Sequence, residues 1–115
     1  MEIRELRAFA VVAEFGAPEM ALYGSSKAAL VLLTKSWAAE YGPAGVRVNA
    51  VSPGPTRTEG TASMGEALDQ LASAAPSGRP GLPEEIAAAI TYLASDEASF
   101  VHGAVLPVDG GRIAV

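Results

Sequence analysis

Tyr23 and Lys27 are the residues whose types and spacing most suggest a chemical reaction in this sequence. If they lie four residues apart in a helix, both side chains project from one face. A free tyrosine, with a pKa of about 10, is a poor acid or base near neutrality. A nearby ammonium stabilises the phenolate, so the pair could exchange a proton with a carbonyl or alcohol oxygen. The same spacing also occurs on ordinary solvated helix faces, so the pattern alone leaves both interpretations open.

The segment that must position this pair is predicted to be a helix over residues 22–41. Its apolar residues follow helical spacing, and Ala and Leu, which dominate it, are strong helix formers. Because Leu30 and Val31 widen the apolar face, we expect much of this helix to be buried. Gly42-Pro43 is expected to end it.

Two apolar segments further along the chain are predicted to be strands. Residues 46–54 alternate apolar and polar side chains, which is typical of a strand with one well-buried face. Residues 104–108 are the last apolar strand, and Asp109-Gly110-Gly111 forms the turn after it. A helix over 83–95 precedes that strand, because Pro83 and the carboxylates after it suit a helix start.

The remaining segments are less regular. Residues 55–82 are rich in Gly, Pro, Ser and Thr, with a short helix expected near 64–75, and so long a connection is often functional, for example as a lid. Residues 1–15 fit either a short amphipathic helix or a helix running into a strand. The order of helices and strands predicts an α/β fold.

Composition excludes several function classes. The chain has 115 residues, a net charge of -5, no Cys and one His. That length supports a single domain over residues 1–115. We expect no metal site, because thiolates are absent and histidine is nearly so, and no nucleic-acid partner, because phosphate binding needs clustered Lys and Arg. There is no apolar run long enough to span a membrane and no signal peptide, which favours a cytoplasmic protein.

Four motifs in order, YGSSKAAL, the helix to Tyr41, VRVNAVSPGPTRT and LPVDGG, resemble the short-chain dehydrogenase/reductase family. The resemblance runs from about Ala13 to Gly111 and corresponds to the C-terminal half of that family's domain, so residues 16–115 are family-like. It implies a partial Rossmann-type, doubly wound sheet flanked by helices. It also implies an oxidoreductase that transfers hydride between NAD or NADP and a small alcohol or carbonyl substrate.

The resemblance assigns roles to individual residues. Tyr23 is the expected catalytic acid/base, and Lys27 is expected to assist it and to hold the cofactor ribose. The expected cofactor-binding residues are Tyr23, Lys27, Pro53, Gly54, Thr56 and Thr58. Hydroxyl groups suit that task because they can donate to a carboxamide or phosphate oxygen. Residues 60–81 match the loop that covers the substrate.

The sequence also departs from the family pattern. None of its 12 glycines forms G-x-x-x-G-x-G or G-x-G-x-x-G, the loops that bring backbone amides to a pyrophosphate. Ala10 stands where the family places a catalytic Ser, thirteen residues before Tyr23. The Asn of the family's proton relay belongs to the half that is missing here. We therefore expect a truncated form without activity of its own.

Two further hypotheses follow. Half of a doubly wound sheet would expose a strand edge and apolar helix faces, which usually find partners. The alternative function is thus a non-catalytic, oligomerising interaction module, with helices 22–41 and 83–95 both used in a homo-oligomer. Residues 1–14 also resemble the first helix of a LysR-type regulator, but no recognition helix follows, and an atypical N-terminal helix that covers the truncated edge is the simpler interpretation.

Overall fold

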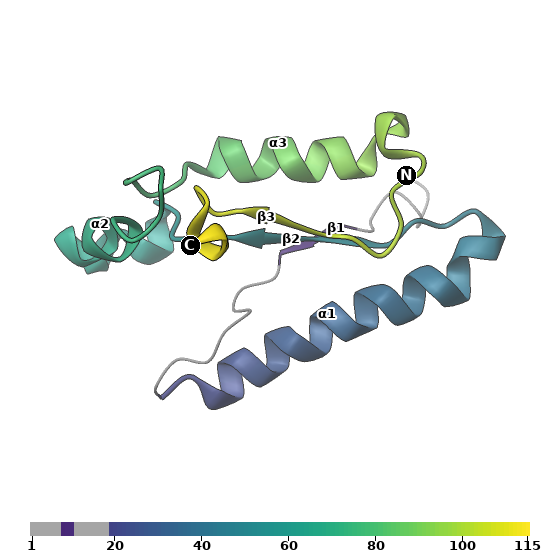
Figure 1. Ribbon diagram of the computed structural model, residues 1–115, viewed down its shortest axis with the longest axis horizontal. Helices are drawn as coiled ribbons and strands as arrows, with labels where there is room; N and C mark the ends of the chain where they lie inside the picture. The colour runs from purple at the N-terminus through teal and green to yellow at the C-terminus, as the bar shows by residue number, and fades with distance from the viewer. Residues whose placement is uncertain (1–7, 11–18) are drawn as a thin grey trace.

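A three-stranded parallel sheet between helices forms the framework of the computed structural model (Figure 1). The structure describes residues 8–10 and 19–115. The strands lie in the order β1 (Ala8–Ala10), β2 (Asn49–Pro53) and β3 (Val105–Val108). Helix α1 (Ala21–Tyr41) lies on one face and α3 (Pro83–Ala94) on the other. This layering confirms the α/β fold expected from the sequence.

Strand β2 is the centre of the sheet and of the core. It pairs in parallel with β1, where Ala8 faces Asn49, and with β3, where Ala50 faces Val105. The buried residues at this centre are Val48, Asn49, Ala50, Val51 and Ser52. The sequence predicted one well-buried face for this strand, but both of its faces are buried, because helices cover both faces of a parallel sheet.

A buried amide ties β2 to the segment that enters β3. The side chain of Asn49 is 1% exposed. Its Nδ2 donates to the carbonyl oxygen of Val101 over 2.8 Å, and its Oδ1 accepts from the amide of Ala104 over 2.9 Å. Both halves of the amide are therefore satisfied, which burial of a polar group requires.

The guanidinium of Arg47 caps the end of α3. It donates to the carbonyl oxygens of Leu93, Ser95 and Ala98 over 2.7–2.9 Å. Carbonyl groups at a helix end have no partner within the helix, and the helix dipole favours a cation there. Arg47, two residues before β2, therefore fixes α3 to the segment that enters this strand.

Helix α1 begins one residue before the predicted start and ends at the predicted Tyr41, but the prediction that much of it is buried was wrong. Only Thr34 and Ala38 are buried within it, whereas Leu22 is 90% and Leu32 66% exposed. Figure 1 shows why so few sheet-facing residues are buried: α1 approaches the sheet at its C-terminal end and diverges from it towards its first turns. Leu22 and Leu32 lie on the face of the helix turned away from Thr34 and Ala38.

The segment between β2 and α3 contains one α-helix. Helix α2 (Glu66–Ala72) is shorter than the helix expected near 64–75 and follows a 3-10 helix over Glu59–Met64. Leu68 and Ala72 are buried, whereas Leu71 is 54% exposed.

Backbone hydrogen bonds close the base of residues 57–81, which we call the connecting segment. The amide of Gly81 donates to the carbonyl oxygen of Pro55 over 2.8 Å, and the amide of Arg57 donates to that of Gly81 over 2.9 Å. The segment therefore leaves and returns at one point beside the end of β2.

The N-terminal alternatives are decided for three residues. Ala8–Ala10 form a strand rather than a helix. The rest of the expected N-terminal helix, and most of the residues that resemble a LysR-type regulator, lie outside the described residues.

An exposed ion pair fixes the start of α3. Arg79 donates to Glu85 through both guanidinium nitrogens, Nη1 over 2.8 Å and Nη2 over 3.0 Å, and Glu85 Oε1 also accepts from the amide of Leu82 over 3.0 Å. The hydrogen bond from Arg79, then that from Leu82, lowers the pKa of Glu85 to about 2. The same carboxylate raises the pKa of Arg79.

The Arg79–Glu85 pair predicts a pH-dependent contribution to stability. Because folding lowers the pKa of Glu85 from 4.5 to about 2, this contribution is complete above pH 4.5 and is lost as the pH falls towards 2. Glu85→Gln should therefore have a lower melting temperature than the wild type at pH 7, with the difference shrinking between pH 4.5 and 2. Thermal melts followed by circular dichroism measure this, with Glu84→Gln as control. A difference that does not change with pH would contradict the assignment.

Gly54 predicts a second effect on stability. A Cβ atom there would lie 2.8 Å from Asp109 Cα, a backbone atom that cannot move without shifting the end of β3. Gly54→Ala should lower the free energy of unfolding by about 1–3 kcal/mol in urea titrations. The control is Gly24→Ala in α1, where a Cβ would meet nothing within 4 Å and should stabilise the helix by about 0.5–1 kcal/mol. Equal stability of Gly54→Ala and the wild type would show that the strand ends are not in close contact.

Candidate active site

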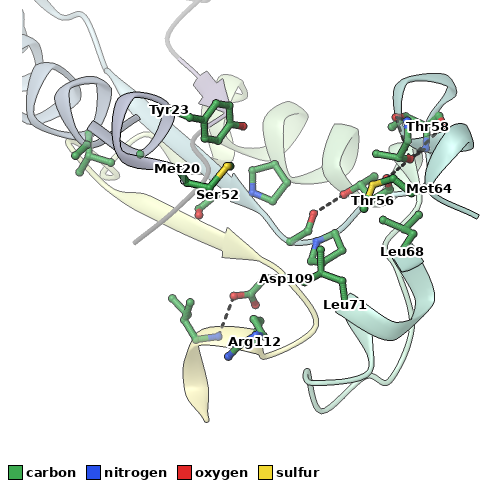
Figure 2. A pocket seen from close by; sticks show the side chains of 18 of the residues that line it. Met20, Tyr23, Ser52, Thr56, Thr58, Met64, Leu68, Leu71, Asp109 and Arg112 are labelled. Atoms are coloured by element: carbon green, nitrogen blue, oxygen red, sulfur yellow. Dashed lines mark hydrogen bonds between the residues drawn. The ribbon is translucent and has the colours of Figure 1, made fainter. Parts of the chain in front are cut away.

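A cavity of about 1160 Å³ lies where the carboxyl ends of β2 and β3 meet the first turns of α1 (Figure 2). Ligands of parallel α/β sheets bind at this edge, because the loops that follow neighbouring strands converge there. The divergence of α1 from the sheet leaves this space open. Its walls include Met20, Tyr23, Val31, Ser52, Pro53, Gly54, Thr56, Thr58, Met64, Leu68, Leu71, Asp109, Arg112 and Ile113.

Tyr23 and Lys27 are adjacent in the structure, as their spacing predicts. Tyr23 lines the cavity and is 41% exposed. The Nζ atom of Lys27 lies 5.2 Å from the centroid of the Tyr23 ring, within the range of a cation–π contact. Lys27 itself stands one turn further along α1 and is not part of the cavity wall. The cation therefore acts on the cavity through the ring of Tyr23.

The four residues expected to bind a cofactor after β2 all line this cavity. Pro53 ends β2, and Gly54, Thr56 and Thr58 follow it. The structure also requires a glycine at position 54, independently of its expected role, because the backbone of Gly54 lies against Asp109. The structure thus brings five of the six candidate residues to one cavity and places Lys27 behind Tyr23.

The hydroxyl of Thr56 is not free to donate to a ligand as we expected, whereas that of Thr58 acts as an acceptor and keeps its own proton. Thr56 Oγ1 donates to the carbonyl oxygen of Gly54 over 2.8 Å. Thr58 Oγ1 accepts from the amide of Thr61 over 3.2 Å as the N-cap of the 3-10 helix. Because the proton of Thr56 is already donated, this hydroxyl offers a ligand only lone pairs, so it suits an N–H or O–H donor.

Sequence reasoning missed several wall residues. Met20, Met64 and Leu71 come from three different segments, and Arg112 from a fourth. No local pattern singles them out. The position of Arg112 after the second of two neighbouring parallel strands could have predicted its place in the wall, because the ends of such strands share one edge of the sheet.

The residues present fit one end of a dinucleotide. The hydroxyls of Tyr23, Thr56 and Thr58 stand in a largely apolar wall at the strand ends, which suits a nicotinamide and its ribose. No glycine loop of the kind that holds a pyrophosphate occurs in the 115 residues. The fit therefore covers the reacting end of the cofactor and not its adenosine end.

Two other kinds of site were searched for in the described ranges, 8–10 and 19–115. These residues contain no group of three or more His, Cys, Asp or Glu that could hold a metal ion. They also contain no helix that is both long and apolar enough to cross a membrane.

Comparison with known proteins gives consistent matches. A family model described as Enoyl-(Acyl carrier protein) reductase matches residues 8–112. The chain is 44% identical over 104 residues to a 3-oxoacyl-(acyl-carrier-protein) reductase of Thermotoga maritima, covering 90% of this chain and 42% of that protein. It is 47% identical over 106 residues to a 3alpha-hydroxysteroid dehydrogenase of Mediterraneibacter gnavus, covering 91% and 42%.

Solved structures agree with the sequence comparisons. A short chain dehydrogenase/reductase family protein superimposes with a TM-score of 0.85 at 48% identity, covering 94% of this chain and 45% of that one. A 4-hydroxyisoleucine dehydrogenase complexed with NADH gives 0.84 at 38% identity, covering 94% and 47%. The chain thus spans less than half the length of these relatives. The match over residues 8–112 and these likenesses together show that the chain belongs to the short-chain dehydrogenase/reductase family of oxidoreductases.

Proposed function

We propose that this chain forms the nicotinamide and substrate end of an NAD(P)-dependent site that interconverts alcohols and carbonyl compounds. The observation that carries the proposal is the position of Tyr23, backed by Lys27, on the wall of a cavity at the carboxyl end of β2. A solved relative at 38% identity is described as complexed with NADH, which supports the choice of cofactor.

Tyr23 moves the proton in this proposal. Bound NAD(P) supplies the hydride acceptor for alcohol oxidation or the hydride donor for carbonyl reduction. In oxidation the phenolate oxygen of Tyr23 takes the alcohol proton, and in reduction the phenol gives its proton to the carbonyl oxygen. The ammonium of Lys27 lies 5.2 Å from the centroid of the Tyr23 ring, where a cation–π contact holds the ring on the cavity side of α1.

Two deficits lead us to propose that the chain alone is inactive. Ala10, at the end of β1, offers no hydroxyl where relatives are expected to polarise the substrate carbonyl. The loss of one such donor costs about 10²–10³ in rate. The pyrophosphate loop is a second requirement that these 115 residues do not meet.

The proposed role of Tyr23 is tested in a chimera that joins the N-terminal half of the Thermotoga maritima reductase to residues 8–115 carrying Ala10→Ser, so that both deficits are repaired. We expect NADPH or NADH oxidation with 3-oxoacyl thioesters, and a loss of about 10²–10⁴ in kcat for Tyr23→Phe. Tyr41→Phe is the matched control, because this tyrosine at the far end of α1 is similarly exposed, 44% against 41%. The unfused chain should show no saturable binding of either nucleotide in calorimetry.

The results that contradict the proposal are specific. If the chimera is active and tolerates Tyr23→Phe, Tyr23 does not take part in proton transfer. If the chimera binds nucleotide but is inactive, the cavity is not the site of the reaction. Saturable micromolar NADH binding by the unfused chain would show that the adenosine end has another site here.

A second candidate function, a homo-oligomerising module, is favoured by the exposed apolar side chains. Within α1, Leu22 is 90% exposed and Leu32 66%. Exposed apolar groups that cluster along one helix are typical of interfaces. We propose that α1 packs against α1 of a second copy. The proposal differs from the expectation that α3 contributes equally, because α3 turns its apolar residues Ile86, Ile90 and Leu93 inward and packs on all three strands.

The oligomer proposal predicts the effect of a charge on α1. Leu32→Glu should convert a dimer or larger species into a monomer in light-scattering measurements, with no loss of helical signal, because Leu32 packs little within one chain. Gln70→Glu on α2 adds the same charge elsewhere and should leave the mass unchanged. A wild-type chain that is monomeric at about 100 μM, a concentration chosen to favour association, would contradict the proposal.

A further inference from the structure

We infer that Ser52 is a ligand-binding residue, whose hydroxyl group donates a hydrogen bond to an uncharged carbonyl oxygen in the cavity. Such an oxygen belongs either to the substrate or to the carboxamide of the cofactor, and the two sources are distinguishable by experiment. The inference deepens the proposed function, on which the identity of the ligand rests, whereas the hydrogen bond itself depends only on the cavity. Neither the Tyr-Lys pattern nor the loop after β2 assigns Ser52 to the site.

Ser52 lies near the end of the central strand, where its side chain meets the cavity. It comes one residue before the end of β2 and lines the cavity, as Tyr23 does (Figure 2). The residue is only 7% exposed. The sheet holds its backbone, because Ser52 pairs with Pro107 in the parallel register of β2 and β3. The hydroxyl is therefore kept at the wall of the cavity and away from bulk solvent.

The hydroxyl of Ser52 differs from the other buried polar groups in having no protein partner. The described residues contain three buried polar side chains, those of Thr34, Asn49 and Ser52. Thr34 Oγ1 donates to the carbonyl oxygen of Leu30 over 2.8 Å, and the amide of Asn49 is bonded at both ends. Within the described part of the chain, no hydrogen bond engages the Ser52 hydroxyl. Because buried polar groups normally have a partner, this one points to a ligand.

Water can satisfy the Ser52 hydroxyl only while the cavity is open to it. A ligand that fills the cavity displaces this water. An apolar group placed against Ser52 would leave the hydroxyl without water and without a partner, which is unfavourable. A ligand oxygen in the same place restores the hydrogen bond. Ser52 therefore favours a ligand with an oxygen at this point over one of the same shape without it.

The surrounding groups indicate which kind of oxygen suits Ser52. The proton of Thr56 is already donated to the carbonyl oxygen of Gly54, whereas that of Ser52 is available to an acceptor. An anionic acceptor would lose hydration here and would need a cation, which a hydroxyl does not provide. Asp109 adds a negative charge to the same wall, which opposes a second one. The matching acceptor is therefore an uncharged carbonyl oxygen.

The apolar side chains of the cavity increase the effect of this one hydrogen bond. Met20, Val31 and Leu68 lie in the same wall as Ser52. In surroundings of low polarity a hydrogen bond is electrostatically stronger than in water, and an unpaired polar group is costlier. The ligand that the wall favours thus combines an apolar body with a carbonyl oxygen.

The test follows the binding of three uncharged probes to the full chain without cofactor by protein-observed NMR titration. The ketone 4-phenyl-2-butanone carries a carbonyl oxygen, 2-methyl-4-phenyl-1-butene has a CH2 group in its place, and nicotinamide carries the carboxamide of the cofactor. Ser52→Ala should weaken at least one carbonyl probe about three- to tenfold, because one hydrogen bond is lost. The alkene should bind the variant equally or more tightly. A weaker ketone identifies the substrate as the source of the oxygen, and weaker nicotinamide identifies the cofactor.

Ser25→Ala is the matched control, because Ser25 also lines the cavity but is exposed to solvent, so all three affinities should stay unchanged. Ser52→Ala should also melt no lower than the wild type, because it removes a buried hydroxyl that has no protein partner.

Four results would overturn the inference: no binding of either carbonyl probe, unchanged binding of both to Ser52→Ala, an equal loss for the alkene, or a lower melting temperature of the variant. None of these results involves hydride transfer. They are therefore distinct from a failure of the chimera, which would overturn the proposed function.

Discussion

The buried amide of Asn49 determines where the strands end, and the cavity follows from that. By bonding to Val101 and Ala104, it holds the entry to β3 beside the start of β2. The register that results pairs Pro53 with Val108, so both strands stop at the same level. The residues after them then meet, with Gly54 against the backbone of Asp109. Loss of the amide would leave a carbonyl and an N–H buried without partners, which costs more than the hydrogen bonds contribute.

The course of α1 opens the cavity. The helix touches the sheet through its later turns, where Thr34 and Ala38 are buried, and leaves it towards Tyr23. A helix parallel to the sheet would fill the space in which a ligand could bind. The exposure of Leu22 and Leu32 has another cause, because both lie on the face of α1 turned away from Thr34 and Ala38.

Local patterns predict the elements well, and contacts distant in sequence explain what they miss. The spacing of Ala and Leu gives the bounds of α1, and Pro83 with its two following carboxylates gives the start of α3. The burial of α1 could not be predicted, because it depends on the angle between helix and sheet. The role of Arg47 depends on carbonyls some fifty residues away. At the site, the Tyr-Lys spacing predicted a contact that the structure contains. The direction of the Thr56 hydroxyl could not be predicted, because it is set by a hydrogen bond to the carbonyl oxygen of Gly54 in the same loop.

The groups proposed to react are held in place by contacts within their own segments. Tyr23 and Lys27 are held by one helix, and Thr56 is held by a hydrogen bond within its own loop. The positions of these three side chains therefore do not depend on a glycine-rich segment. Enzymes use binding energy from parts of a ligand remote from the reaction to orient the reacting groups. The interactions that the described residues offer to a ligand at this edge are the hydroxyls and the apolar wall, so the orientation of a reacting group against Tyr23 depends on them.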